Sequence, residues 1–344
     1  MRIGVLTGGG DAPGLNAAIR AVARKAFAGE DAVVGIPNGW AGALGEGELV
    51  ELTRRNVSGI LQLGGTMLGS SRTNPLKLDG GLDRVRATVR NAGLDALVAI
   101  GGDDTLGVAA RLAETGIAVV GVPKTMDNDL SVTEYCIGFD TAVGRVTEAL
   151  DRLHTTAAAH HRVMVVEVMG RDTGWVAVMG GLAGGADMII IPEFEITVDE
   201  VVSHVHARRA AGSDFSIIVV SEGVRMDGLG DEGEAGGPRD AFGHVQLSRR
   251  GVGERLADLI EQRTQLETRA TVLGHTQRGG TPSAFDRIWA THVGVAAYDL
   301  LVAQAWGRMP VVQCGEVRTA AIADVVAQQR RVPEELYRLA QVFY

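Results

Sequence analysis

Short runs of apolar residues alternate along this chain with longer stretches in which apolar residues recur every three or four positions. The runs are rich in Val, Ile, Leu and Ala, which is typical of strands buried in a parallel sheet. The alternation predicts an α/β fold, with helices covering the sheet on both faces. In the first part of the chain we predict strands at 3–6, 33–36, 96–100 and 117–122, and helices at 15–26, 82–92 and 105–114.

The same alternation restarts beyond residue 140 and predicts a second α/β body. Its predicted strands are 162–168, 188–191, 216–220 and 268–273, and its predicted helices are 141–156, 175–184, 198–211, 253–264 and 333–340. The stretch 225–243 is rich in glycine and acidic residues, which indicates a surface loop. The segment 57–63 fits a helix or a strand equally well. A chain of 344 residues also exceeds the roughly 250 to 300 residues at which single cores stop growing.

Composition and charge exclude several classes of function. The net charge of −9 argues against binding nucleic acid or an anionic membrane, because such binders carry a basic surface. No apolar run approaches the roughly 18 residues of a membrane span, and we find no signal peptide. The two cysteines lack the spacing of a metal site, so we expect reduced thiols and a cytoplasmic protein. The 47 glycines are about twice the usual share of about 7%.

Three glycine-rich or acidic phrases directly follow predicted strands, at residues 8–14, 101–105 and 123–129. Ligands of open parallel sheets bind at the carboxyl ends of the strands, so we expect the three phrases to meet there. The first phrase has Pro13 where a dinucleotide fingerprint needs its third glycine, and Gly-Lys never occurs in the chain. What remains is either a structural turn or an anion site made of backbone amides at a helix N-terminus.

The acidic phrases suit phosphoryl transfer. Asp103 is a credible Mg²⁺ ligand, because Mg²⁺ takes one or two carboxylates together with phosphate oxygens; the alternative is a helix cap. Asp127 suits the base that a hydroxyl acceptor needs, and Asp129 could orient it; the alternative is a simple turn. Arginines near strand ends and glycine turns match phosphate geometry, although each alone fits an ordinary surface charge. They are Arg72, Arg162, Arg171, Arg269 and Arg278.

Taken together, these phrases resemble the phosphofructokinase family. The matching runs are GVLTGGGDAPGLNAAIR, LGSSRTNP, AIGGDDT, GVPKTMDNDL, GFDTAV, VVEVMGR, SEG and RATVLGHTQRGGTPSAFDR. The resemblance implies two Rossmann-like, three-layer lobes with mostly parallel sheets and an active site in the cleft between them. It implies a donor lobe of residues 1–140 plus about 277–305. The sugar-phosphate lobe would be residues 141–276 plus about 306–344.

The resemblance also implies roles for individual residues. Gly10, Gly102 and Asp104 match donor positions, and Asp103 matches the Mg²⁺ residue. The matches to the acceptor site are Thr125, Asp127, Asp129, Arg162, Met169, Gly170, Arg171, Glu222, Arg269, His275 and Arg278. Asp127 would accept the proton, while Lys124, Arg72 and Arg171 offset charge on the transferred group. Arg162 and Arg269 resemble arginines that reach in from a neighbouring subunit, which implies a homodimer or homotetramer.

The donor is expected to be pyrophosphate. ATP-using members resemble Gly-Gly-Asp-Gly at 101–104, and Asp104 would oppose ATP by bulk and by charge. Lys124 replaces a glycine common in the ATP enzymes and offers a cation to pyrophosphate. The expected reaction is a reversible, Mg²⁺-dependent transfer to the 1-hydroxyl of fructose 6-phosphate, which gives fructose 1,6-bisphosphate and phosphate. The alternatives are an ATP-dependent enzyme and a non-catalytic sugar-phosphate sensor, and Asp172-Thr173 leaves sedoheptulose 7-phosphate open as an acceptor.

Overall fold

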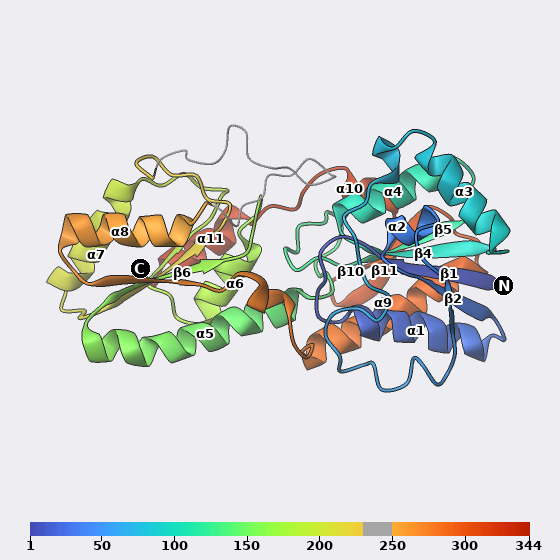
Figure 1. The fold of residues 1–344 in the computed structure, drawn as a ribbon. Coiled ribbons are helices and arrows are strands. Elements are labelled where there is room, and N and C mark those ends of the chain that lie inside the picture. The colour runs from blue at the N-terminus through green and yellow to red at the C-terminus, as the bar shows by residue number, and fades with distance from the viewer. Residues whose placement is uncertain (230–249) are drawn as a thin grey trace. The chain divides into compact units, whose positions relative to one another are not determined.

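The computed structural model describes residues 1–229 and 250–344, which form two units (Figure 1). Unit 1 comprises residues 1–141 and 278–330, and unit 2 comprises 142–229, 250–277 and 331–344. Each unit is built around its own mostly parallel sheet, which confirms the predicted α/β fold. Most of the loop predicted at 225–243 lies outside the described residues.

Unit 1 is built on a five-stranded sheet of order β3-β2-β1-β4-β5, parallel except at β3. The strands of this sheet are β1 (Arg2–Thr7), β2 (Ala32–Ile36), β3 (Val50–Leu52), β4 (Ala96–Gly101) and β5 (Val119–Pro123). A separate antiparallel pair is formed by β10 (Arg308–Gln313) and β11 (Glu316–Ala321). The helices are α1 (Leu15–Ala28), α2 (Trp40–Ala43), α3 (Gly81–Asn91), α4 (Asp103–Glu114), α9 (Ala284–Val302) and α10 (Ile322–Val326), with a 3₁₀ turn at Pro75–Lys77.

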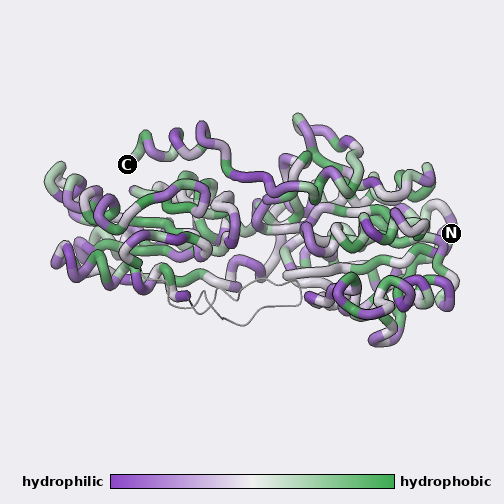
Figure 2. The backbone as a smooth tube through the Cα atoms, turned by 90° about the horizontal axis from the view of Figure 1, so that it is seen from above, coloured by the Kyte–Doolittle hydropathy of each residue, from purple (hydrophilic) through white to green (hydrophobic). Residues whose placement is uncertain are grey.

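Two apolar layers hold unit 1 together, one on each face of its sheet. On one face α1 and α9 pack on the strands, and on the other α2, α3, α4 and α10 do so. Figure 2 shows hydrophobic segments running through the interior of each unit. The central strands β1 and β4 are almost fully buried, as their unbroken apolar runs predict.

Unit 2 contains a four-stranded parallel sheet of order β7-β8-β6-β9. Its strands are β6 (Val163–Val168), β7 (Met188–Ile190), β8 (Ser216–Ser221) and β9 (Thr268–Val272). Its helices are α5 (Phe139–His160), α6 (Trp175–Ala183), α7 (Val198–Ala210), α8 (Val252–Thr264) and α11 (Glu334–Gln341), with a 3₁₀ helix at Gly274–Arg278. Within the described part of the chain, the helices are all too short or too polar to cross a membrane.

The sequence missed several elements of unit 1. The segment 57–63 forms neither helix nor strand but a series of turns. Helix α9 was not predicted, because Phe285 and Ile288 lie exposed among its apolar residues and blur the helical stripe. The β10–β11 hairpin was also missed: Cys314 and Gly315 both have positive φ at its turn, where Asn-Gly is the usual marker.

The expected boundary near residue 305 is wrong, because residues 306–330 belong to unit 1. Strand β10 lies against β5, and Gly307 donates its N–H to the carbonyl of Val119. Ser131 in turn donates its hydroxyl to the carbonyls of Asp324 and Val325 at 2.8 and 2.9 Å. The chain therefore passes to unit 2 after Arg330.

Candidate active site

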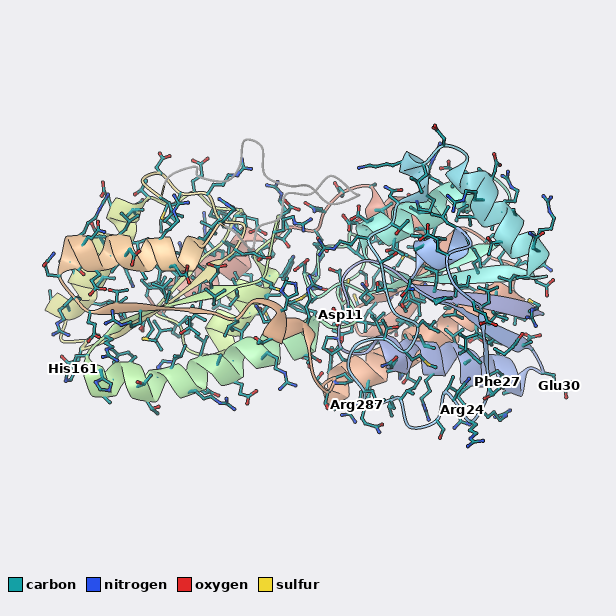
Figure 3. The ribbon with its side chains drawn as sticks, viewed as in Figure 1. Asp11, Arg24, Phe27, Glu30, His161 and Arg287 are labelled. Atoms are coloured by element: carbon teal, nitrogen blue, oxygen red, sulfur yellow. The ribbon has the colours of Figure 1, made fainter. Side chains whose placement is uncertain are left out.

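The glycine loop after β1 is held between three segments of unit 1. The N–H of Gly8 donates to the carbonyl of Ile100, and that of Gly9 to the carbonyl of Ser71, both at 3.0 Å. A Cβ at Gly8 would lie 2.5 Å from the Thr105 hydroxyl, so only glycine allows this approach. Figure 3 labels Asp11 in this loop, which precedes α1, and Glu30, which follows the other end of that helix. The loop therefore lies at the carboxyl edge of the sheet, as predicted.

Lys124, directly after β5, is buried against this loop. Its Nζ atom donates to the carbonyls of Gly8 at 2.9 Å and Gly10 at 2.5 Å. Burial lowers the pKa of Lys124 to about 8, and the charge of Arg278 acts in the same direction. The carboxylates of Asp11, Asp127 and Asp103 partly oppose the shift. The structure thus brings the predicted cation and two predicted acidic residues into electrostatic contact.

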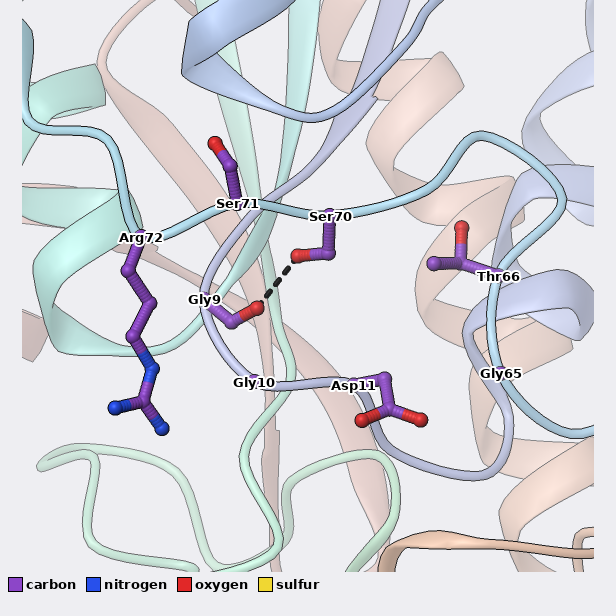
Figure 4. Close-up of a pocket in the computed structure, with 8 residues that line it drawn as sticks. All are labelled: Gly9, Gly10, Asp11, Gly65, Thr66, Ser70, Ser71 and Arg72. Carbon is purple, nitrogen blue, oxygen red and sulfur yellow. Dashed lines mark hydrogen bonds between the residues drawn. The ribbon is translucent and has the colours of Figure 1, made fainter.

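A pocket of about 460 Å³ opens beside the glycine loop (Figure 4). Its lining residues are Gly9, Gly10, Asp11, Gly65, Thr66, Ser70, Ser71 and Arg72. The Ser70 hydroxyl donates to the carbonyl of Gly9 at 2.5 Å, which joins the two walls of the pocket. Gly10 and Arg72 were predicted from the sequence, but Asp11 was not singled out although it stands in the same phrase as Gly10.

The aspartates of the second phrase begin helix α4. Asp103 and Asp104 stand in its first turn, after Gly102 as the N-cap residue, so the helix starts two residues earlier than predicted. Carboxylates are stabilised at this position by the partial positive charge of the helix N-terminus. Neither aspartate is the N-cap residue, because that position is occupied by Gly102.

The third phrase alternates buried and half-buried side chains. Met126, Asn128 and Leu130 are at most 2% exposed, and they anchor the segment. The intervening residues Thr125, Asp127 and Asp129 are half-buried. The N–H of Asp127 donates to the Thr125 hydroxyl at 3.1 Å, a local turn that sets the direction of the backbone at Asp127. The alternation leaves the side chains with predicted roles less buried than their packed neighbours, although Oδ1 of Asp127 is itself buried.

Arg278 lies at the glycine loop of unit 1, although the resemblance grouped it with the acceptor residues. Its Nη1 atom donates to the carbonyl of Asp11 at 3.0 Å. A Cβ at Gly10 would lie 2.7 Å from the same Nη1 atom, so the guanidinium is packed against the loop. The sequence could not indicate this contact, because the two segments lie at opposite ends of the chain.

Unit 2 gathers five of the eleven predicted acceptor residues at the carboxyl edge of its own sheet. Met169, Gly170 and Arg171 follow β6, Glu222 follows β8, and His275 follows β9. Gly170 has a φ of 145°, and a Cβ there would lie 2.4 Å from the Ser221 hydroxyl. The Met169 N–H donates to Oε1 of Gln277, a fully buried residue that the sequence analysis did not single out.

Arg162 and Arg269 lie at the other edge of that sheet. Arg162 immediately precedes β6, and Arg269 pairs in register with Met164 near the start of that strand. At about 3.3 Å per residue, roughly 20 Å of strand separates Arg162 from Met169. Arg162 forms an ion pair with Glu267 at 2.8 Å, and Arg269 pairs with Glu267 and Glu261. Within unit 2, these arginines and the carboxyl-edge residues therefore do not form one site.

The two α/β units, each with glycine turns and charged side chains at the carboxyl edge of a mostly parallel sheet, define an α/β class of fold. The family model for phosphofructokinase matches residues 2–301. The chain belongs to the phosphofructokinase family.

Individual relatives carry names that differ in the donor. The chain is 53% identical over 346 residues to a pyrophosphate–fructose 6-phosphate 1-phosphotransferase of Amycolatopsis mediterranei, with all of both chains covered. It is 44% identical to ATP-dependent 6-phosphofructokinase 3 of Streptomyces coelicolor, with 99% of each chain covered. A structure of a pyrophosphate-dependent phosphofructokinase from Marinobacter aquaeolei shares the fold, with a TM-score of 0.83, 24% identity, and coverage of 97% of this chain and 86% of that one.

Proposed function

We propose that this protein transfers a phosphoryl group from pyrophosphate to the 1-hydroxyl of fructose 6-phosphate, reversibly. The products are fructose 1,6-bisphosphate and phosphate. The observation that carries the donor assignment is the charge built into the glycine loop, where Lys124 is buried against the carbonyls of Gly8 and Gly10. An ammonium has three N–H donors and these contacts use two, and on this proposal the third would meet the short, highly charged pyrophosphate.

Asp104 supports pyrophosphate over ATP. It stands in the first turn of α4, next to Asp103 and close to the glycine loop through β4. A carboxylate there adds bulk and negative charge where the rest of a nucleotide would have to pass, whereas pyrophosphate ends before that point. The higher identity to the pyrophosphate-named relative than to the ATP-named one agrees with this assignment.

In the proposed reaction Asp127 takes the proton of the 1-hydroxyl as its oxygen attacks the near phosphorus. The bond from that phosphorus to the bridging oxygen breaks, and phosphate leaves with the electron pair. Lys124, Arg72 and Arg171 offset the negative charge on the transferred group. Thr125 and Asp129 hold the acceptor and the base in place on the same segment.

The acidic residues of unit 1 fit Mg²⁺, which neutralises phosphate charge when bound. Asp103 would hold it, with phosphate oxygens of the donor as further ligands, because the described residues contain no group of three or more His, Cys, Asp or Glu side chains that could hold a metal by themselves. On this proposal Gly10 and Gly102 contact the donor. Removal of the metal with a chelator should abolish transfer, and Mg²⁺ should restore it.

We also propose that the active form is a homodimer or homotetramer. Arg162 stands roughly 20 Å along the strand from Met169, and Arg269, which pairs with Met164, roughly 16 Å, both beyond the reach of an arginine side chain. Their positions suit contacts to the sugar phosphate bound by a neighbouring copy. The proposed acceptor set on the carboxyl edge of unit 2 is Met169, Gly170, Arg171, Glu222 and His275, and Arg278, which contacts the glycine loop of unit 1, is proposed as a further member.

Initial rates with both donors and two acceptors test the proposal. Mg-pyrophosphate with fructose 6-phosphate should give the highest rate, well above MgATP and above sedoheptulose 7-phosphate. A higher rate with MgATP would replace the donor assignment by the ATP-dependent alternative. Absence of turnover with either donor, with sugar phosphate still bound, would favour the non-catalytic sensor.

A further inference from the structure

The segment from Thr125 to Ile137 carries the proposed base, and it contains no helix and no regular strand. It leaves the sheet after β5 and returns where Ile137 pairs with Lys124. Asn128 has a φ of 52° and Val132 a φ of 65°, and for a β-branched residue such a value is strained. Because the segment lacks the hydrogen bonds of a helix or strand, its strained backbone conformation must be stabilised by contacts with other residues.

Arg330 makes three of these contacts. Its backbone N–H donates to the carbonyl of Asp129 at 2.7 Å. Its Nη1 atom donates to the carbonyls of Asn128 at 3.4 Å and Glu134 at 3.0 Å. The guanidinium thus joins the outgoing arm of the segment, at the carbonyl of Asn128 next to Asp127, to the returning arm, at the carbonyl of Glu134.

The buried side chain of Asn128 adds two hydrogen bonds within the same segment. Its Nδ2 atom donates to the carbonyl of Glu134, the acceptor that Arg330 also uses, and its Oδ1 atom accepts from the N–H of Cys136. Asn128 is 2% exposed, whereas Arg330 is half-buried and reaches the segment from outside. A second anchor, Ser131, holds the segment further along, at the carbonyls of Asp324 and Val325.

We propose that Arg330 is a positioning residue for Asp127: its guanidinium fixes the peptide groups on the C-terminal side of the base and so orients the carboxylate. This inference rests on the proposed role of Asp127. Because a misplacement of about 1 Å at a reacting group costs about 100-fold in rate, loss of Arg330 should lower kcat while leaving the binding residues intact.

The surface around Arg330 makes a rescue experiment possible. Arg330 lines a pocket of about 320 Å³ together with Val132, Thr133, Glu134, Gln313, Cys314 and Arg318. A small molecule can therefore reach the position of the guanidinium once the side chain is removed. The adjacent Arg331 is exposed and serves as a matched control, since it carries the same charge one residue further along.

The test compares Arg330→Ala, Arg330→Lys and Arg331→Ala in the full chain. For Arg330→Ala we expect kcat to fall about 100-fold, with KM for fructose 6-phosphate and pyrophosphate unchanged, and partial recovery of kcat in millimolar guanidinium chloride. Arg330→Lys should keep an intermediate kcat, and Arg331→Ala should match the wild type with no response to guanidinium. An unchanged kcat in Arg330→Ala, or a loss that guanidinium does not reverse, would overturn the assignment.

Amide hydrogen exchange separates this inference from the proposed reaction. Arg330→Ala should speed exchange at residues 125–137, and Arg331→Ala should not. If the wild type transfers phosphate from neither donor, the proposed function fails, yet faster exchange in that segment would still identify the Arg330 contact as the restraint. Unchanged exchange in Arg330→Ala would contradict the restraint itself.

Discussion

Units 1 and 2 use the same edge of a parallel sheet in different ways. In unit 1, charged side chains bind the loop itself: Lys124 donates to the carbonyls of Gly8 and Gly10, and Arg278 to that of Asp11. In unit 2, the chain turns at this edge through Gly170, whose φ of 145° disfavours other residues. On the proposed function, the dense anionic donor meets charges fixed in advance in unit 1, whereas the sugar phosphate meets a shaped backbone turn and a few polar contacts in unit 2.

The largest expected effect is on the base in unit 1. Asp127→Ser should lower kcat about 1000-fold, because it removes the proton acceptor, while fructose 6-phosphate still binds. Stopped-flow rates and equilibrium binding of the sugar phosphate measure the two quantities separately. Asp79→Ser, at an exposed position, is the control. Turnover close to that of the wild type would remove Asp127 from this role.

The buried cation comes next. Lys124→Met should lower kcat/KM for pyrophosphate about 100-fold, and Lys25→Met, at an exposed lysine, should not. In the wild type, kcat/KM for pyrophosphate should decrease as pH rises through about 8. The pKa of Lys124 is lowered to about 8, and only the ammonium form binds the donor.

The pH dependence of stability shows whether a loss of activity above about pH 8 comes from deprotonation of Lys124 or from unfolding. An unfolded lysine titrates at 10.5, so between about 8 and 10.5 the unfolded state binds more protons. The free energy of unfolding therefore rises with pH through this group. Activity that falls above pH 8 while the protein stays folded would fit Lys124, and a flat profile would contradict its role.

A subunit-mixing experiment tests whether the amino edge of unit 2 serves another copy. Arg162→Ala and Asp127→Ser should each be nearly inactive alone. Mixed after dissociation and reassembly, they should regain activity, because some sites then combine an intact Asp127 with an intact Arg162. Arg338→Ala, which alters an exposed arginine of α11, should stay active without mixing. No recovery in the mixture would argue that Arg162 acts within its own chain.

The smallest expected effect concerns donor choice. Asp104→Gly should raise kcat/KM for MgATP about tenfold, equal to about 1.4 kcal/mol, because it removes a carboxylate from the path of the nucleotide. Asp83→Gly makes the same change in the first turn of α3 and should leave ATP use unaltered. If Asp104→Gly uses ATP no better than the wild type, the exclusion of ATP has another cause.

The sequence by itself determined the alternation of strands and helices, the division into two α/β bodies and the strand ends that carry functional phrases. These features are local, because apolar runs and glycine turns act over a few residues. The order of the strands' carboxyl ends then suffices to assign Asp103, Asp127 and Gly10 to a common edge of the sheet.

Only the tertiary structure decided which of these residues touch. Lys124 and Gly8 are separated by 116 residues, and Arg278 and Asp11 by 267. Residues 306–330 return to unit 1 and bring Arg330 to the segment of the base. No local sequence pattern encodes these long-range contacts, because they depend on how the helices and strands pack. Burial then changes the chemistry of the contacting groups, as the lowered pKa of Lys124 shows.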